Sequence, residues 1–352
     1  MAQSVASAPV LRHEHSAQGG PSDQSRSQRR EPHRHTYAAI DLGTNNCRLL
    51  IARPTDSGFT VIDAFSRIVR LGEGLAGSGE LSPDAMDRAV GALGVCADKL
   101  RRRNVSLSRS VATEACRRAR NGQLFADRVR DETGIALEII EPAEEARLAV
   151  LGCHKLLEPG DGPALIFDIG GGSTELVLVD QSPGGPQIRA WWSAPWGVVS
   201  LTESEGKEAL EGPERLKAYM RMRERARRAF ANFTVMLPER RDGIRLLGTS
   251  GTVTTLASVH LALPSYDRRA VDGLHVPTDA MQQISAMIAG MDYEQRSALP
   301  CIGSERADLV VAGCALLEAI IEIWPAKNLG IADRGIREGI LRSLMARDGW
   351  QL

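Results

Sequence analysis

The sequence predicts an α/β protein in which two lobes each contain a mixed sheet with flanking helices. Segments typical of strands alternate with segments typical of helices over most of the 352 residues. One pattern also occurs twice, namely a strand, an aspartate, a glycine-rich turn and a second strand. The two copies lie 127 positions apart, counted from Asp41 to Asp168. We interpret this repeat as an internal duplication with one copy in each lobe.

The first copy predicts an antiparallel hairpin. The apolar segments 37–40 and 47–52 are joined by a turn of glycine and asparagine, and a third strand-like segment follows at 59–65. Because hairpins add antiparallel strands to the parallel strands of a βαβ pattern, we expect both sheets to be mixed.

Helices and strands alternate through the rest of the chain. Ser82 and Pro83 predict a helix start, with serine as the cap and proline at the first helical position. We expect helices at about 82–102, 123–133, 142–157, 212–237, 252–261, 278–290, 304–324 and 334–345, and strands at 105–112, 136–140, 164–167, 175–179 and 244–247.

These elements divide the chain into three predicted parts. Residues 1–35 are rich in Ser, Gln, Arg and His and predict a disordered tail. Residues 36–149 form the predicted N-terminal lobe with the first glycine-rich turn. Residues 150–352 form the predicted C-terminal lobe with the second turn, and the last helix is a candidate to pack back on the first lobe.

Composition limits the partners and the compartment. The net charge of −1, from 43 basic and 44 acidic residues, argues against bulk nucleic-acid binding. No apolar segment is long enough for a membrane span, and the N-terminus lacks the apolar stretch of a secretory signal. The six cysteines form no C-x-x-C pair and are typical of buried thiols in a reducing compartment. We therefore expect a cytoplasmic protein.

The second glycine-rich turn predicts a phosphate site with a metal. Glycines leave backbone N–H groups free to converge on one anion, and the hydroxyl side chains that follow add donors. Asp168 and Glu175 would repel a phosphate alone, but they suit a hard cation such as Mg²⁺ held between them. A plain hairpin turn would explain the glycines and leave these acids unexplained. The predicted phosphate-binding residues here are Gly170, Gly171, Gly172, Ser173 and Thr174.

Two further turns are candidates for the same site. The first copy offers Asp41, which we also count as a metal ligand, with Gly43, Thr44 and Asn45. A third turn precedes a predicted helix, where amides and the helix dipole favour an anion, and a simple capped helix start explains it equally well. Its candidate residues are Gly248, Ser250, Gly251 and Thr252. No P-loop pattern is present, and neither hairpin turn completes a dinucleotide-binding pattern before a helix.

Five segments in order resemble the exopolyphosphatase and guanosine pentaphosphate phosphatase family. They are 41–49 (DLGTNNCRL), 144–148 (EEARL), 168–176 (DIGGGSTEL), 248–252 (GTSGT) and 333–339 (DRGIREG). The resemblance extends over residues 36–347. It implies the two-lobed, actin-like (ribonuclease H-like) fold that sugar kinases and the heat-shock 70 proteins share, with the active site in the cleft between the lobes.

The resemblance also implies roles for two residues. Glu144 and Glu145 both lie in a predicted first helical turn, where acids stabilise the helix dipole, and the residues alone do not choose between them. The family motif singles out Glu145 as the residue that activates water. Arg117 matches the family's phosphate-contacting arginine, and Arg67 and Arg70 precede another family-like segment.

The activity that the resemblance implies is Mg²⁺-dependent release of the terminal phosphate of inorganic polyphosphate. Removal of the 5′-phosphate of guanosine pentaphosphate is the first alternative. A small-molecule kinase and a non-catalytic sensor of an alarmone or nucleotide are further alternatives. Longer relatives continue past the position that corresponds to Leu352, so we expect short polyphosphates or a nucleotide as substrate, and a homodimer stays an open possibility.

Overall fold

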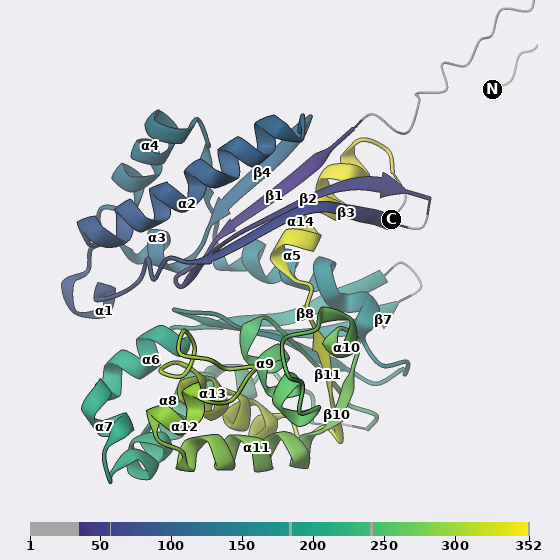
Figure 1. Cartoon of the computed structure of the whole chain (residues 1–352). Coiled ribbons are helices and arrows are strands. Elements are labelled where there is room, and N and C mark those ends of the chain that lie inside the picture. The colour runs from purple at the N-terminus through teal and green to yellow at the C-terminus, as the bar shows by residue number, and fades with distance from the viewer. Residues whose placement is uncertain (1–34, 57, 183–184, 240–241, 351–352) are drawn as a thin grey trace, which may run out of the picture. The chain divides into compact units, whose positions relative to one another are not determined.

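The computed structural model describes residues 35–350, apart from 57, 183–184 and 240–241. The predicted disordered tail lies outside the described residues, except for His35. From His35 onward the chain forms one compact unit with two mixed sheets and the helices around them (Figure 1). The predicted α/β fold with two mixed sheets is therefore confirmed, whereas the lobe boundary between residues 149 and 150 stays a prediction.

The first sheet has five strands in the order β3-β2-β1-β4-β5. The β1–β2 and β2–β3 pairs are antiparallel, and the β1–β4 and β4–β5 pairs are parallel. The antiparallel half arises from consecutive hairpins, and the parallel half from strands that return after helices. The strands are β1 (Tyr37–Leu42), β2 (Asn46–Thr55), β3 (Gly58–Ile68), β4 (Leu107–Ala112) and β5 (Leu137–Ile139).

The second sheet repeats this arrangement and adds one strand at an edge. Its order is β10-β11-β9-β6-β7-β8, and β8-β7-β6-β9-β11 has the same directions of pairing as β3-β2-β1-β4-β5. The duplication seen in the sequence is thus a duplication of the sheet. The strands are β6 (Ala164–Ile169), β7 (Thr174–Ser182), β8 (Gly185–Ala194), β9 (Arg245–Thr249), β10 (His275–Pro277) and β11 (Asn328–Ala332).

Helices follow the strands of both sheets. In the first half of the chain they are α1 (Leu75–Ser78), α2 (Pro83–Arg102), α3 (Glu114–Arg118), α4 (Gly122–Thr133), α5 (Pro142–Cys153) and the 3₁₀ turn η1 (His154–Leu156). In the second half they are α6 (Val198–Glu205), α7 (Lys207–Glu211), α8 (Arg215–Thr234), α9 (Gly251–His260), α10 (Arg268–Val271), α11 (Thr278–Gly290), α12 (Tyr293–Ser297), α13 (Val310–Ile323) and α14 (Ile336–Arg347). None of the described helices is both long and apolar enough to cross a membrane.

Helix α5 lies between the two sheets (Figure 1). Leu148 and Ala149 pack against the first sheet, together with α14. Ala146 and Val150, on another face of the helix, pack against β6 and β7 of the second sheet. The apolar residues of α5 therefore fix its position relative to both sheets, and with it the position of the acids in its first turn.

Helix α14 packs against α5 and against β1 and β2 of the first sheet. Glycines allow the two helices to approach closely. A Cβ added at Gly339 would overlap the backbone of Leu148, and one added at Gly152 would overlap the backbone of Gly335. The last helix is therefore held against the first sheet.

Three strands, several short helices and several helix ends differ from the sequence prediction. We did not predict β8, β10 or β11, which are edge strands or short strands whose pattern resembles that of a loop. The helix expected at 304–324 begins only at Val310, because residues 303–309 form successive turns. The helix expected at 142–157 ends at Cys153 and continues as the 3₁₀ turn η1.

Candidate active site

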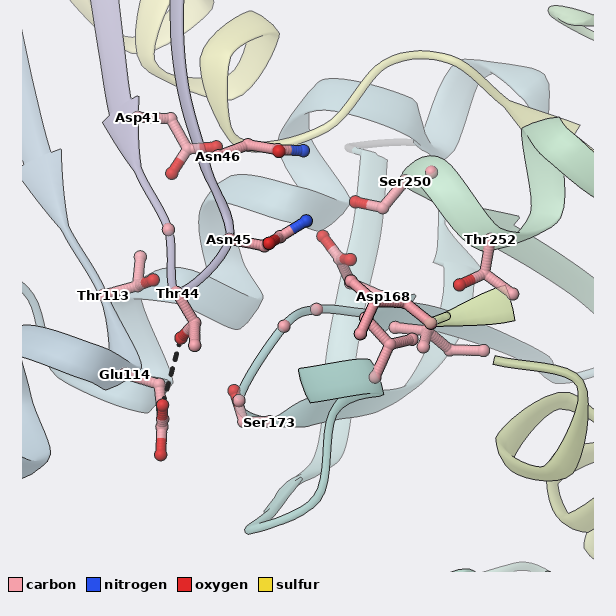
Figure 2. A pocket seen from close by; sticks show the side chains of 18 of the residues that line it. Asp41, Thr44, Asn45, Asn46, Thr113, Glu114, Asp168, Ser173, Ser250 and Thr252 are labelled. Carbon is pink, nitrogen blue, oxygen red and sulfur yellow. Dashed lines mark hydrogen bonds between the residues drawn. The ribbon is translucent and has the colours of Figure 1, made fainter. Parts of the chain in front are cut away.

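Both glycine-rich hairpin turns line one pocket, together with the start of α9 and the segment that precedes α13 (Figure 2). Fourteen predicted site residues are in its lining: Asp41, Gly43, Thr44, Asn45, Glu145, Asp168, Gly170, Gly171, Gly172, Ser173, Glu175, Ser250, Gly251 and Thr252. The pocket thus collects residues from both sheets and from α5.

The two hairpin turns have the same local geometry. The Gly43 N–H donates to the Asn46 carbonyl at 2.9 Å, and the Gly170 N–H donates to the Ser173 carbonyl at 3.0 Å. In each turn the aspartate lies two positions before this glycine and is the next-to-last residue of its strand. The repeated sequence pattern therefore folds into a repeated turn.

The two turns are in direct contact. A Cβ added at Gly171 would lie 2.9 Å from the Thr44 Cβ and 3.1 Å from the Asn45 backbone nitrogen. A Cβ added at Gly172 would overlap the Glu114 carboxylate. Real Cβ atoms do not tolerate such distances, so glycine is required at both positions by the approach of the other turn.

The third turn contributes the N-terminus of α9. Ser250 precedes the helix with a φ of 75°, in the left-handed region, and makes no side-chain cap bond to the helix. The proximity of its hydroxyl to Asp168 opposes the rise in the pKa of that carboxyl. The start of α9 is therefore joined to the second copy of the pattern and lines the same pocket.

Three carboxylates stand on the strands around these turns. Asp168 and Glu175 face each other in the register of β6 and β7, and Asp41 is on β1. Loss of solvation raises the pKa of Asp41 to about 6, and loss of solvation with the nearby charge of Asp168 raises the pKa of Glu175 to about 7. Hydrogen bonds from Ser173 at 2.7 Å and Ser193 at 2.9 Å partly offset the shift at Glu175.

A fourth carboxylate, Glu145, enters the pocket from α5. Its side chain is 8% exposed, and burial raises its pKa well above the usual value, with the charge of Glu175 adding to the shift. Arg117 opposes the shift and donates to Glu145 Oε2 at 3.1 Å. Glu144 points to the surface instead and accepts hydrogen bonds at 2.7 Å from Arg109 and Arg147.

The carboxylates fit a hard cation in two respects. The Oδ1 atom of Asp168 is buried without a hydrogen-bond partner. In addition, the pKa values of Asp41, Asp168 and Glu175 are all raised, so a nearby positive charge would stabilise their ionised forms. Within the described part of the chain, no three His, Cys, Asp or Glu side chains are close enough to form a complete ligand cluster. Mg²⁺ does not require one, because it keeps several waters and binds through one or two carboxylates and phosphate oxygens.

Comparison with known proteins identifies the family. The model of the Ppx/GppA phosphatase family matches residues 50–348. The chain belongs to this family. Exopolyphosphatase 2 of Mycobacterium tuberculosis is 33% identical to it over 324 residues, which cover 87% of this chain and 98% of that protein.

Two further proteins are similar over most of this chain. The solved structure of the Aquifex aeolicus family member has a TM-score of 0.74 and 29% identity, and the match covers 90% of this chain and 99% of the other. This match confirms the predicted actin-like fold. A protein of Photobacterium profundum named guanosine-5′-triphosphate,3′-diphosphate pyrophosphatase is 28% identical over 90% of this chain and 61% of its own length.

Three of the predicted site residues do not line the pocket. The Thr174 hydroxyl donates to the Trp196 carbonyl at 2.7 Å and is fully buried there. Gly248 lies within β9, where an added Cβ would come within 2.9 Å or less of Phe167 and Val253, so its smallness serves packing. Arg117 lies behind Glu145 and also donates to the Ile140 carbonyl at 2.7 Å.

Arg48 and Glu114 line the pocket but received no role from the sequence. Arg48 lies opposite Asp41 in the β1–β2 register, and its charge lowers the pKa of both Asp41 and Asp168. The alternation of β2 placed Arg48 on the face of Asp41 and was the signal available in the sequence. Glu114 also lines the pocket, and no sequence pattern pointed to it, because only the tertiary fold brings α3 beside Thr44.

Proposed function

We propose that this protein hydrolyses the terminal phosphoanhydride bond of inorganic polyphosphate and releases phosphate. The observation that carries the proposal is the buried carboxylate of Glu145 in the same pocket as both glycine-rich turns. The likeness to exopolyphosphatase 2 of Mycobacterium tuberculosis supports polyphosphate as the substrate.

In this proposal the protein supplies a phosphate cradle and a base. Backbone amides of the two hairpin turns hold the terminal phosphate, and Arg48 adds positive charge beside them. Glu145 accepts a proton from the attacking water. Its raised pKa makes it a stronger base than an ordinary carboxylate, and general bases work best when their pKa is near the working pH.

We also propose that Mg²⁺ binds beside the phosphate, with Asp41, Asp168 and Glu175 as the residues that would hold it directly or through water. When bound, the ion supplies positive charge to the phosphate oxygens. The unpartnered Asp168 Oδ1 and the raised pKa values of these carboxyl groups support the assignment. Arg48 lowers the pKa of Asp41 and Asp168 and so favours their ionised forms before any ion binds.

Guanosine pentaphosphate is the second candidate substrate. The likeness to the Photobacterium profundum protein supports it. Apolar side chains of Ile68, Leu309 and Val310 also line the pocket, and such surfaces suit a nucleoside more than a chain of phosphates. Both substrates end in a phosphoanhydride, so the same cradle and base serve either one.

The test is phosphate release from polyphosphate, guanosine pentaphosphate and ATP, each with and without Mg²⁺. We expect the wild-type protein to release phosphate from polyphosphate fastest. The Glu145→Gln variant should lose roughly 10²–10⁴-fold in kcat because it lacks the base, while binding is retained.

Glu144→Gln is the matched control, since Glu144 is the neighbouring acid and lies outside the pocket. It should keep near-normal activity. Release from guanosine pentaphosphate alone would favour the second candidate, and transfer to an added acceptor would favour a kinase. Binding without release from any compound would leave a sensor and contradict the proposal.

We further propose that the enzyme acts in the cytoplasm. All six cysteines are free thiols, and five of them are buried, which is typical of proteins in a reducing compartment.

A further inference from the structure

The pocket wall contains a carboxylate, Glu114, that the proposed reaction does not use. Glu114 is the first residue of α3, is 9% exposed, and lines the pocket beside both phosphate turns. A negative charge at this place repels a phosphate, so its presence beside an anion cradle calls for a physical reason.

Glu114 contacts both turns at the point where they meet. Its Oε2 accepts a hydrogen bond from Thr44 Oγ1 at 3.0 Å (Figure 2). The same carboxylate lies against Gly172, where an added Cβ would overlap it. Its Oε1 is 3.5 Å from Nη1 of Arg118, whose side chain is 44% exposed and therefore mostly paired with water.

The Thr44 side chain is held in this orientation from its other side. Its methyl group lies against Gly72, where an added Cβ would overlap it, and its carbonyl accepts from the Gly72 N–H at 2.9 Å. A β-branched side chain with its methyl group fixed has few other positions for its hydroxyl. The Thr44 hydroxyl therefore points at Glu114.

A threonine hydroxyl has one proton to donate, and an ionised carboxylate only accepts. We propose that Glu114 is a positioning residue that accepts the hydrogen bond of the Thr44 hydroxyl and leaves the Thr44 oxygen as an acceptor toward the pocket. An ionised phosphate oxygen is also an acceptor, so the Thr44 hydroxyl does not bind it. The Thr44 oxygen can instead accept a hydrogen bond from a donor. In the proposed function, on which this last step rests, that donor is the attacking water.

Binding of inorganic phosphate tests the inference without any need for turnover. Isothermal titration at pH 8 compares wild type, Thr44→Val, Glu114→Met and Glu114→Asp, with Thr44→Val added to each Glu114 variant. In the wild-type background, Thr44→Val should change the phosphate Kd by less than about twofold. Once Glu114 no longer accepts the hydrogen bond of Thr44, the Thr44 hydroxyl becomes a donor to the phosphate, and Thr44→Val should then weaken binding about tenfold, as expected for a hydrogen bond to a charged group.

The two Glu114 variants separate charge from geometry. Aspartate keeps the negative charge but is one methylene too short to reach Thr44, whereas methionine keeps the length and removes both the charge and the acceptor oxygens. The cost of Thr44→Val should appear in both backgrounds, and thermal unfolding identifies any variant that fails to fold. An equal loss from Thr44→Val in all three backgrounds, or no phosphate binding by any protein, would overturn the inference.

Kinetics provide the second readout. With polyphosphate, Thr44→Val should lower kcat and leave KM unchanged, because Thr44 contacts the water and not the substrate phosphate. A rise in KM with unchanged kcat would contradict the inference. A protein that binds phosphate in the predicted pattern but hydrolyses no polyphosphate would refute the proposed function and leave the orientation of Thr44 by Glu114 intact.

Discussion

The Cα atom of Gly171 faces the side chain of Thr44 so closely that an added methyl group would lie 2.9 Å from the Thr44 Cβ. This contact joins the second copy of the repeated pattern to the first. Because each copy is one turn of a rigid hairpin, the contact sets the distance between the two sets of backbone amides that face the pocket.

Gly171→Ala should therefore damage the site more than the fold. The added methyl group forces the turns apart by a fraction of an ångström to one ångström, and displacements of that size cost roughly 100-fold in rate. We expect kcat/KM for polyphosphate to fall by about that factor. Gly91→Ala is the control, since Gly91 lies on an exposed face of α2 with open space around it, and alanine there should raise stability slightly. Equal activity of the two variants would contradict the role of the contact.

Arg117→Met should shift the pH dependence of the reaction. The positive charge of Arg117 lowers the pKa of Glu145, so its removal raises that pKa further. The base is then protonated up to a higher pH, and the acidic limb of the kcat/KM profile moves to higher pH. The loss should be largest at low pH and should shrink as the pH rises. Arg118→Met, at an exposed neighbouring position, should leave the profile unchanged. A loss by the same factor at every pH would exclude this role for Arg117.

Stability without divalent cations should fall as the pH rises. The pKa of Asp41 is raised to about 6 and that of Glu175 to about 7 in the folded protein, so folding favours their protonated forms. The stabilisation is complete below about pH 4 and is lost as the pH rises through these values; for Asp41 alone the shift corresponds to ~3 kcal/mol.

Melting curves between pH 4.5 and 8 should show this decline, and Mg²⁺ should restore stability increasingly toward pH 8. The same Mg²⁺ effect at both ends of the range would argue against the site, and Asp41→Asn should flatten the decline.

The ion pair between Arg70 and Asp308 should limit the binding of anions. Arg70 Nη1 lies 3.1 Å from Asp308 Oδ2, and the Arg70 backbone N–H donates to the Asn45 carbonyl in the first turn at 3.0 Å. Both side chains are partly exposed, so the pair contributes little stability and exchanges readily.

Asp308→Asn should lower the KM for polyphosphate several-fold by freeing Arg70, and Arg70→Met should raise it, with both effects weaker at high salt. The exposed Arg101→Met variant is the control. If Asp308→Asn and Arg70→Met change KM in the same direction, the ion pair only connects the segments that contain Arg70 and Asp308.

The sequence predicted the sheets and turns where local chemistry determines them. Asp41 and Asp168 end or nearly end apolar strands before glycine turns, so the hairpins and the duplication followed from short segments. Strand β11 (Asn328–Ala332) is only five residues long with a glycine inside it, and β8 is an edge strand, so neither has a clear alternating pattern.

The residues of the site were likewise predictable only where the pattern that marks them is local in the sequence. The residues of the two turns were found because glycine and flanking acids are adjacent in sequence. Glu145 could be separated from Glu144 only by a family resemblance, whereas in the structure the packing of α5 between the sheets buries Glu145 and leaves Glu144 partly exposed. Glu114 could not be found, because its partner Thr44 is 70 residues away and the contact arises only from the parallel β1–β4 pairing.

The most direct test of the central claim is a crystal structure of the Glu145→Gln variant with a short polyphosphate and Mg²⁺. We expect density for the terminal phosphate between the two hairpin turns, within hydrogen-bond distance of amides from both residues 43–45 and residues 170–173. A terminal phosphate bound by one turn alone, or elsewhere on the protein, would contradict it.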